Sequence, residues 1–211
     1  MRVLFLTDSL SLPREGDGEV VKYDETYINI LRKEFPEAVI ADCAIGGATI
    51  WDLFKQSFYY KFFEPDLVVL HCGIVDCAPR AFTAFEQKVL NKLGLRPKGF
   101  TRFLRKNRGL KLTSKSQFEK LTLRLKNQFK DVPMYSIGIL PASTDYEKKV
   151  PGIAGSVKRY NQILSKQFHF IDNSDFPREG ILSDHHHLNK LGHKAIAKKL
   201  KPVFEKEIYS P

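Results

Sequence analysis

Residues 2–9 read Arg-Val-Leu-Phe-Leu-Thr-Asp-Ser, a short apolar run that ends in three polar residues. The run predicts a buried strand over Arg2–Leu6, and the polar residues mark its end. Further apolar runs have the length of buried strands, and they lie at Ala38–Ala44, Leu67–Cys72, Met134–Ile139 and Phe168–Ile171. Segments with helical spacing alternate with them, at Glu19–Phe35, Ile50–Phe63, around Ser156–Phe168 and from Asn189 to about Ile208.

Continuously apolar strands that alternate with helices indicate a parallel sheet covered on both faces. We therefore predict the α/β class, a doubly wound three-layer α/β/α fold with a mostly parallel five-stranded sheet. The length of 211 residues fits one domain spanning 1–211. A basic helical insertion is expected at about residues 81–130, as two or three helices broken around Gly94–Gly99 and Gly109–Thr113.

Charge is unevenly placed along the chain. The formal net charge is +10, and fourteen Lys and Arg residues lie between residues 88 and 130. Such a patch suits nucleic acid, an anionic membrane surface or an acidic glycan, or it is simply a solvated helical face. Of these partners we expect an acidic glycan and not nucleic acid. No oligomeric state is predicted.

The cellular compartment is predicted from three features that the sequence lacks: a membrane span, a signal peptide and a disulfide framework. No apolar run approaches the roughly 18–20 residues that span a bilayer. The apolar run near the N-terminus is too short for the core of a signal peptide. Three cysteines, Cys43, Cys72 and Cys77, are an odd number in apolar surroundings, so a disulfide framework is not expected. A cytoplasmic protein without a membrane span is therefore predicted.

Small and polar residues follow every predicted strand. In open parallel sheets the ligand crevice lies beyond the carboxyl ends of the strands. A functional crevice is therefore expected where these residues converge: Ser9, Gly46-Gly47, Gly73–Asp76, Pro141 and Asp184–His187.

The last of these segments, residues 183–189, reads Ser-Asp-His-His-His-Leu-Asn. The Asp184 carboxylate can take the Nδ1 proton of His187 and leave Nε2 as a base. A helix start with an Asp cap and solvated histidines is one alternative. A metal site of His185, His186 and His187 with His71 or Cys72 is another, but no pair has zinc-ligand spacing. No metal and no cofactor are predicted.

Ser9 stands at the end of its strand, where its hydroxyl can project into the crevice. A serine becomes a nucleophile when a base lies beside it, and His187 with Asp184 is the candidate. Backbone N–H groups of Ser9 and Gly47 are the predicted donors to an oxyanion.

Four blocks of this chain resemble those of the SGNH (GDSL) hydrolases, in order and from end to end. Residues 7–10, Thr-Asp-Ser-Leu, resemble the Gly-Asp-Ser-Leu block, and residues 44–49 resemble the second block with Gly47 at the oxyanion glycine. Gly73–Asp76 is similar to the Gly-x-Asn-Asp block, and Asp184–His187 to the Asp-x-x-His block. The resemblance implies Ser9 as nucleophile, His187 as base, Asp184 as its partner, and ester substrates without a metal.

Two positions depart from the family pattern. Thr7 replaces its first glycine, and Val75 stands where its asparagine donates to the oxyanion. This departure leaves three alternatives. The two backbone donors suffice, another residue such as Arg80 replaces the asparagine, or activity is weak. Residues 73–80 resemble a branch associated with bacterial surface-polysaccharide biosynthesis. Residues expected to line the site are Asp8, Gly46, Gly73, Val75, Asp76 and Arg80, although a salt bridge between Asp76 and Arg80 that braces the loop is an alternative.

The sequence thus predicts a serine-dependent esterase that deacetylates an acylated carbohydrate through an acyl-serine intermediate. Its partner would be a small-molecule or oligosaccharide ester. Acyl transfer to a sugar hydroxyl passes through the same intermediate and stays open. A glycan-binding module of the same fold with weakened catalysis is the non-enzymatic alternative.

Overall fold

The computed structural model describes residues 1–95 and 98–209, and in this part of the chain it has a five-stranded parallel sheet with the order β4-β1-β5-β6-β7. Each neighbouring pair is parallel, and the registers include Leu6 opposite Cys43 and Leu70. The predicted strands and their parallel pairing are confirmed. The bounds are β1 (Arg2–Thr7), β4 (Val39–Ala44), β5 (Leu67–His71), β6 (Met134–Ile137) and β7 (His169–Ile171).

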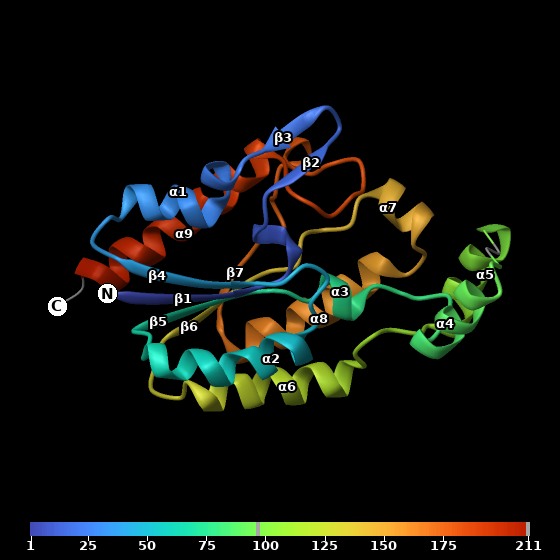
Figure 1. The fold of residues 1–211 in the computed structure, drawn as a ribbon, viewed down its shortest axis with the longest axis horizontal. Coiled ribbons are helices and arrows are strands. Elements are labelled where there is room, and N and C mark those ends of the chain that lie inside the picture. The colour runs from blue at the N-terminus through green and yellow to red at the C-terminus, as the bar shows by residue number, and fades with distance from the viewer. Residues whose placement is uncertain (96–97, 210–211) are drawn as a thin grey trace.

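Helices cover both faces of this sheet, which confirms the doubly wound α/β/α prediction (Figure 1). One face carries α1 (Tyr27–Glu34) and α9 (Lys190–Tyr209). The other carries α2 (Ile50–Tyr60), α6 (Lys115–Gln128) and α8 (Ile153–Gln167). The middle strands are apolar and have no exposed surface at Val3–Leu6 and Leu67–Leu70, so burial from both sides explains their unbroken hydrophobic runs.

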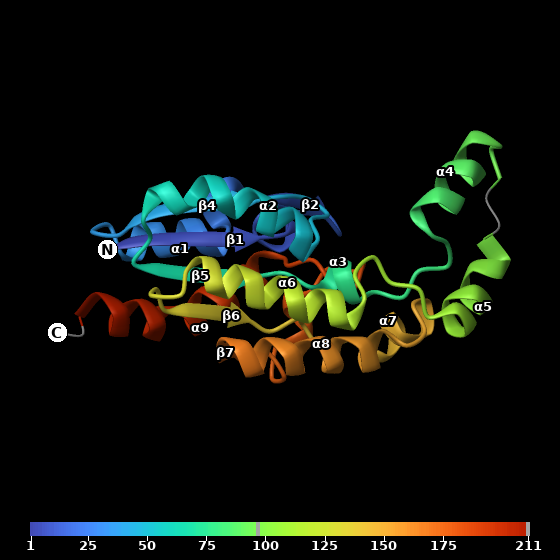
Figure 2. The ribbon, with the colours of Figure 1, turned by 90° about the horizontal axis from the view of Figure 1, so that it is seen from below.

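The basic section divides into two parts with different environments. Helix α6 packs on α2 and α8 and fully buries Phe118 and Leu125. Helices α4 (Ala84–Lys92) and α5 (Lys98–Arg108) instead project away from the layers, beyond the short helix α3 (Ile74–Cys77), as Figure 2 shows. Helices α4, α5 and α6 lie in this section, and the segment between α5 and α6 contains the predicted break at Gly109–Thr113. The other predicted break, around Gly94–Gly99, includes residues 96 and 97, which lie outside the described residues. Arg96, one of its basic residues, lies outside the described residues.

The predicted helix over Glu19–Phe35 is wrong in its first half. Residues 14–21 form a hairpin of β2 (Arg14–Gly16) and β3 (Glu19–Val21), and a short 3₁₀ turn, η2 (Tyr23–Glu25), precedes α1. Asp17 and Gly18 join the two strands with φ of +55° and +75°. Positive φ at both central residues is the two-residue hairpin turn that an Asp-Gly pair favours, and this local preference outweighs the helical spacing.

Short elements complete the chain. They are η1 (Ser9–Ser11), η3 (Lys61–Phe63), α7 (Thr144–Lys149) and η4 (Arg178–Gly180). Helix α7 was not predicted, although Ser143 caps it by accepting a hydrogen bond from the Tyr146 N–H at 3.0 Å. Among the described residues, no helix combines the length and apolar character that a bilayer crossing requires.

Candidate active site

Ser9 lies at the carboxyl end of β1, in the turn η1. The backbone there is held by Asp8, whose N–H donates to the His71 carbonyl at 3.1 Å and whose Oδ1 accepts from the Leu10 N–H at 3.0 Å. Asp8 has no exposed surface, and burial raises its pKa to about 7. Asp8 is therefore buried behind the turn and stabilises it, while Ser9 keeps 7% of its surface exposed.

The loop of residues 182–189, here called the histidine loop, connects η4 to α9. Its ends are closed by hydrogen bonds from the Leu182 N–H to the His187 carbonyl at 2.8 Å and from the Asn189 N–H to the Gly180 carbonyl at 3.1 Å. Asn189 Oδ1 accepts from the Gly192 N–H at 3.0 Å, so the predicted helix cap at Asn189 is present. A Cβ on Gly192 would lie 2.1 Å from the Gly180 carbonyl oxygen, so this close approach requires glycine.

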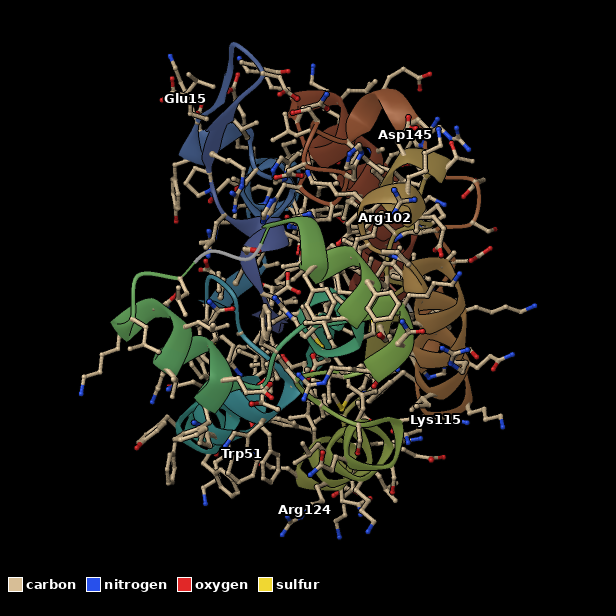
Figure 3. All side chains as sticks on the ribbon, turned by 90° about the vertical axis from the view of Figure 1, so that its right-hand side faces the viewer. Glu15, Trp51, Arg102, Lys115, Arg124 and Asp145 are labelled. Carbon is tan, nitrogen blue, oxygen red and sulfur yellow. The ribbon has the colours of Figure 1, made fainter. Side chains whose placement is uncertain are left out.

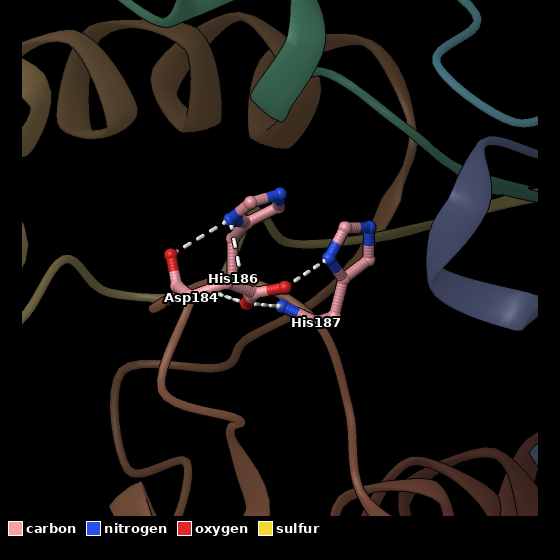
Figure 4. A group of neighbouring side chains, drawn as sticks. All are labelled: Asp184, His186 and His187. Atoms are coloured by element: carbon pink, nitrogen blue, oxygen red, sulfur yellow. Dashed lines mark hydrogen bonds and ion pairs between the residues drawn. The ribbon is translucent and has the colours of Figure 1, made fainter. Parts of the chain in front are cut away.

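These two segments, far apart in sequence, meet side chain to side chain. Ser9 Oγ lies 2.9 Å from His187 Nε2. On the other side of the same ring, His187 Nδ1 lies 2.6 Å from Asp184 Oδ2, as Figure 4 shows. The Nδ1 proton directed at the carboxylate leaves Nε2 to accept the Ser9 hydroxyl proton. The predicted nucleophile, base and orienting carboxylate are therefore in contact, with the base between the other two.

The Asp184 carboxylate is held in its charged form. Burial alone would raise its pKa, but the hydrogen bond from His187 Nδ1 and those from the His187 and His186 N–H groups outweigh burial and hold the pKa well below its usual range. A permanently charged Asp184 keeps the His187 ring oriented and stabilises it when it becomes protonated.

Asp184, His186 and His187 also offer potential metal-ligand atoms within 4.8 Å of one another. His187 is engaged by Ser9 and Asp184, and His186 Nδ1 lies 3.1 Å from the Asp184 carbonyl. The further ligand considered from sequence, His71, is fully buried and lies 3.0 Å from the Tyr27 hydroxyl. The donor atoms of this cluster thus match a proton relay to Ser9 more closely than a ligand set.

The β2–β3 hairpin anchors the histidine loop, a role that sequence reasoning missed. Asp17 Oδ2 accepts from the Ser183 N–H at 2.6 Å and Oδ1 from the Ser183 hydroxyl at 2.5 Å. Glu19 Oε1 accepts from the Lys190 N–H at 3.1 Å. The Asp17-Gly18 pair could have revealed the hairpin, but its contact with a segment 166 residues away has no signal in the sequence.

The glycine turn after β4 presents backbone donors. The Ala48 N–H closes the turn on the Ile45 carbonyl at 3.2 Å, and Gly47 is exposed with φ of +71°. Within the described part of the chain, neither the Gly47 N–H nor the Ser9 N–H has a hydrogen-bond partner. Both predicted oxyanion donors are therefore unengaged.

Asp76 is buried and holds the start of α2, which follows this glycine turn. Its carboxylate has no exposed surface and accepts from the Ile50 N–H, at 3.1 Å to each oxygen, and from the Thr113 hydroxyl. Burial raises its pKa to about 6. Gly73, before it, has φ of +117°, and a Cβ there would lie 2.7 Å from Ile139 Cδ1, so glycine is required.

Val75 and Arg80 line a cavity of about 260 Å³ that Asp184 and His186 also border. Arg80 Nη2 donates to the Val75 carbonyl at 3.5 Å, and no ion pair joins Arg80 to Asp76 among the described residues. The cavity also includes Arg105 of α5, which the sequence did not single out. Figure 3 looks onto this end of the molecule, where α5 with Arg102 crosses in front of the strand ends.

No model of a protein family matches the sequence, and no curated protein matches it. Solved structures do. A lipase/acylhydrolase from Enterococcus faecalis superposes with a TM-score of 0.65 at 12% identity, over 97% of this chain and 95% of that one. A member of the lipolytic protein G-D-S-L family from Veillonella parvula gives 0.61 at 13% identity, over 97% and 98%.

A psychrotrophic esterase from Pseudoalteromonas sp., in a structure inhibited by monoethylphosphonate, gives a TM-score of 0.55 at 13% identity over 98% of each chain. The agreement extends over nearly the whole length of both chains in all three cases. The chain therefore has the fold of the SGNH (GDSL) hydrolases, as the resemblance of its four blocks implied.

Proposed function

We propose that this protein is a serine ester hydrolase of the SGNH type, with Ser9, His187 and Asp184 as its catalytic residues. The observation that carries the proposal is the unbroken contact from Ser9 Oγ through the His187 ring to Asp184. The esterases and lipases among the structures of the same fold support ester hydrolysis in general.

In the proposed reaction Ser9 Oγ attacks the acyl carbonyl carbon while His187 Nε2 takes the hydroxyl proton. The tetrahedral intermediate collapses, His187 returns the proton to the leaving alkoxide, and an acyl-serine remains. A water molecule then attacks the acyl-serine, with His187 as base, and releases the acid and free Ser9. Asp184 stays charged throughout and stabilises the imidazolium.

The oxyanion would be stabilised by the N–H groups of Ser9 and Gly47, which have no other partner among the described residues. Valine at position 75 has no donor, so this site works with the backbone pair. Removing one such donor from a serine hydrolase costs roughly 3–4 kcal/mol of transition-state stabilisation. We therefore expect turnover below that of relatives with three donors.

We further propose deacetylation of an acylated carbohydrate as the reaction, in a chain that works as one domain over 1–211. Within the basic section at 81–130, predicted as an insertion, only α4 and α5 project from the layers, because α6 packs on α2 and α8. The similarity of residues 73–80 to a branch associated with surface-polysaccharide biosynthesis supports this substrate class. Transfer of the acyl group to a sugar hydroxyl remains the second candidate, because the acyl-serine serves either acceptor.

The test is hydrolysis of p-nitrophenyl acetate by wild type and Ser9→Ala in parallel, each with and without a chelator. We expect activity that disappears in Ser9→Ala and persists with the chelator. Activity that survives the substitution contradicts the nucleophile, and loss on chelation brings the Asp184, His186 and His187 metal site forward. Without activity in either protein, labelling of Ser9 by a fluorophosphonate identifies an acyltransferase that lacks its acceptor, and absence of labelling contradicts the proposal.

A further inference from the structure

The cavity beside the histidine loop gathers positive charge from three separate elements. Arg80 follows α3, Arg105 belongs to α5, and Lys149 ends α7, and all three line the same space of about 260 Å³. Among the described residues that line it, Asp184 is the only acidic one. That carboxylate is already engaged by His187 and by two backbone N–H groups.

The guanidinium groups of Arg80 and Arg105 have more N–H donors than their hydrogen bonds to nearby carbonyl groups use. Each arginine carries five N–H donors. Arg105 donates through Nη1 to the Lys149 carbonyl at 3.1 Å, and Arg80 through Nη2 to the Val75 carbonyl at 3.5 Å. The Nε atoms of Arg80 and Arg105 are buried and have no hydrogen-bond partner within the described chain. Bracing of the neighbouring loops therefore uses only a small part of their capacity.

None of these three cations is in an ion pair with a described acidic residue, in contrast to Arg108 on the same helix α5, whose Nη2 lies 2.9 Å from Glu86 Oε1. Like charges around one cavity repel one another, and buried unpaired donors cost stability. An anionic ligand with several oxygens would relieve both costs, since arginine binds carboxylates and phosphates through paired hydrogen bonds.

We propose that this cavity is an anion subsite, in which Arg80, Arg105 and Lys149 bind an acidic group of the ester substrate. The inference rests on the proposed function, because the cavity borders Asp184 and His186 and an occupant would lie next to the reacting ester. The substrate is then an ester of an acidic sugar. Its charge comes from a carboxylate or a phosphate, which share the chemistry that two guanidinium groups and an ammonium group recognise.

Binding tests this subsite without any turnover. The Ser9→Ala variant keeps the cavity, and it is titrated by calorimetry with glucuronate, glucose 6-phosphate and glucose. We expect at least one of the two acidic sugars to bind and glucose not to bind, with a preference between the acids that identifies the charged group. Affinity is expected to fall as salt rises from about 0.05 to about 0.5 M, where screening shortens to a few ångströms. Equal binding of all three sugars, or binding of none, would overturn the subsite.

Substitutions then test whether the acidic sugar binds in this cavity. Arg105→Gln in the Ser9→Ala background is expected to weaken binding of the acidic sugar by roughly 10- to 100-fold, as the loss of a charged hydrogen-bonding partner implies. Lys106→Gln removes the same charge from the exposed neighbouring position and is expected to have less than about a twofold effect. Lys149→Gln, an exposed position, repeats the test if Arg105→Gln does not fold. Equal effects of the cavity and control variants would overturn the assignment.

Turnover separates this inference from the proposed function. The wild type is assayed on monoacetylated glucuronate, monoacetylated glucose and p-nitrophenyl acetate. One outcome is Ser9-dependent hydrolysis of all three compounds without a preference for the acidic sugar. That outcome contradicts the anion subsite but agrees with the proposed hydrolase function. The opposite outcome is binding of acidic sugars without Ser9-dependent hydrolysis. That outcome contradicts the proposed hydrolase function but agrees with the anion subsite.

Discussion

The two sides of the candidate site differ in how the side chains assigned to function are paired. On the side of β1 and the histidine loop, Ser9, His187 and Asp184 are connected by hydrogen bonds of 2.6–2.9 Å. On the side of α3 and α5, the buried Nε–H groups of Arg80 and Arg105 have no hydrogen-bond partner among the described residues. Paired groups have a fixed geometry, which chemistry needs, and unpaired groups are available to a ligand. The difference indicates a reacting side and a recognition side.

The largest effect is expected on the reacting side, from Asp184→Asn. An amide cannot hold the His187 tautomer that leaves Nε2 free, so kcat should fall by about 1,000- to 10,000-fold with the fold retained. The measurement is p-nitrophenyl acetate hydrolysis, with Asp131→Asn as a control at an exposed position. A decrease of less than tenfold would mean that Asp184 does not orient the base.

Val75→Asn tests whether a side-chain donor at position 75 increases the rate. Val75 lines the cavity and its side chain has no donor. An asparagine would add a donor at the position where the SGNH family has its oxyanion asparagine. A hydrogen bond to a charged oxygen is worth about 1.5–3 kcal/mol, so kcat should rise by about 10- to 150-fold. Val75→Ala changes shape without adding a donor and serves as the control. An unchanged kcat in Val75→Asn would show that the backbone donors of Ser9 and Gly47 suffice.

Asp17→Asn should have a smaller effect, because it loosens the support of the reacting side without touching it. The substitution keeps the hairpin turn, which asparagine tolerates, but weakens both bonds to Ser183. We expect kcat to fall by a few-fold with KM little changed, and the Ser183 amide to exchange faster with solvent. Glu15→Gln, on the exposed face of the same hairpin, should leave both unchanged. If both variants behave alike, the hairpin does not position the loop.

The smallest effect on activity is expected for Asp8→Asn, which changes stability instead. The pKa of Asp8 is about 7 in the folded protein against an ordinary 3.8, so the folded state retains a proton that the unfolded chain has lost between these values. This contribution to the free energy of unfolding is fully present below about pH 4 and is lost as pH rises through 7. The neutral asparagine does not titrate.

Urea denaturation of Asp8→Asn and wild type at pH 5 and pH 8 measures this difference, because all other carboxylates are shared. The stability of the variant relative to wild type should increase from pH 5 to pH 8. A difference that is the same at both pH values would mean that Asp8 titrates normally.

Much of the fold was predictable because its signals are local. Unbroken apolar runs such as Val3–Leu6 identify strands buried on both faces, and their alternation with helices leaves few topologies. The error at Glu19–Phe35 arose where two local signals competed. The Asp17-Gly18 turn outweighed a helical spacing that continues only from Tyr27.

The sequence by itself determined which residues are available for chemistry: Ser9 after the first strand, the glycines after the second, and Asp184 with His187 near the end. Parallel strands place their carboxyl ends at one edge, so these positions had to converge. Only the tertiary structure decided which side chains surround them. Asp17 meets Ser183, and Arg105 meets Lys149 beside Asp184, across 166 and 44 residues of chain. Such contacts depend on how loops pack in space, which no local pattern encodes.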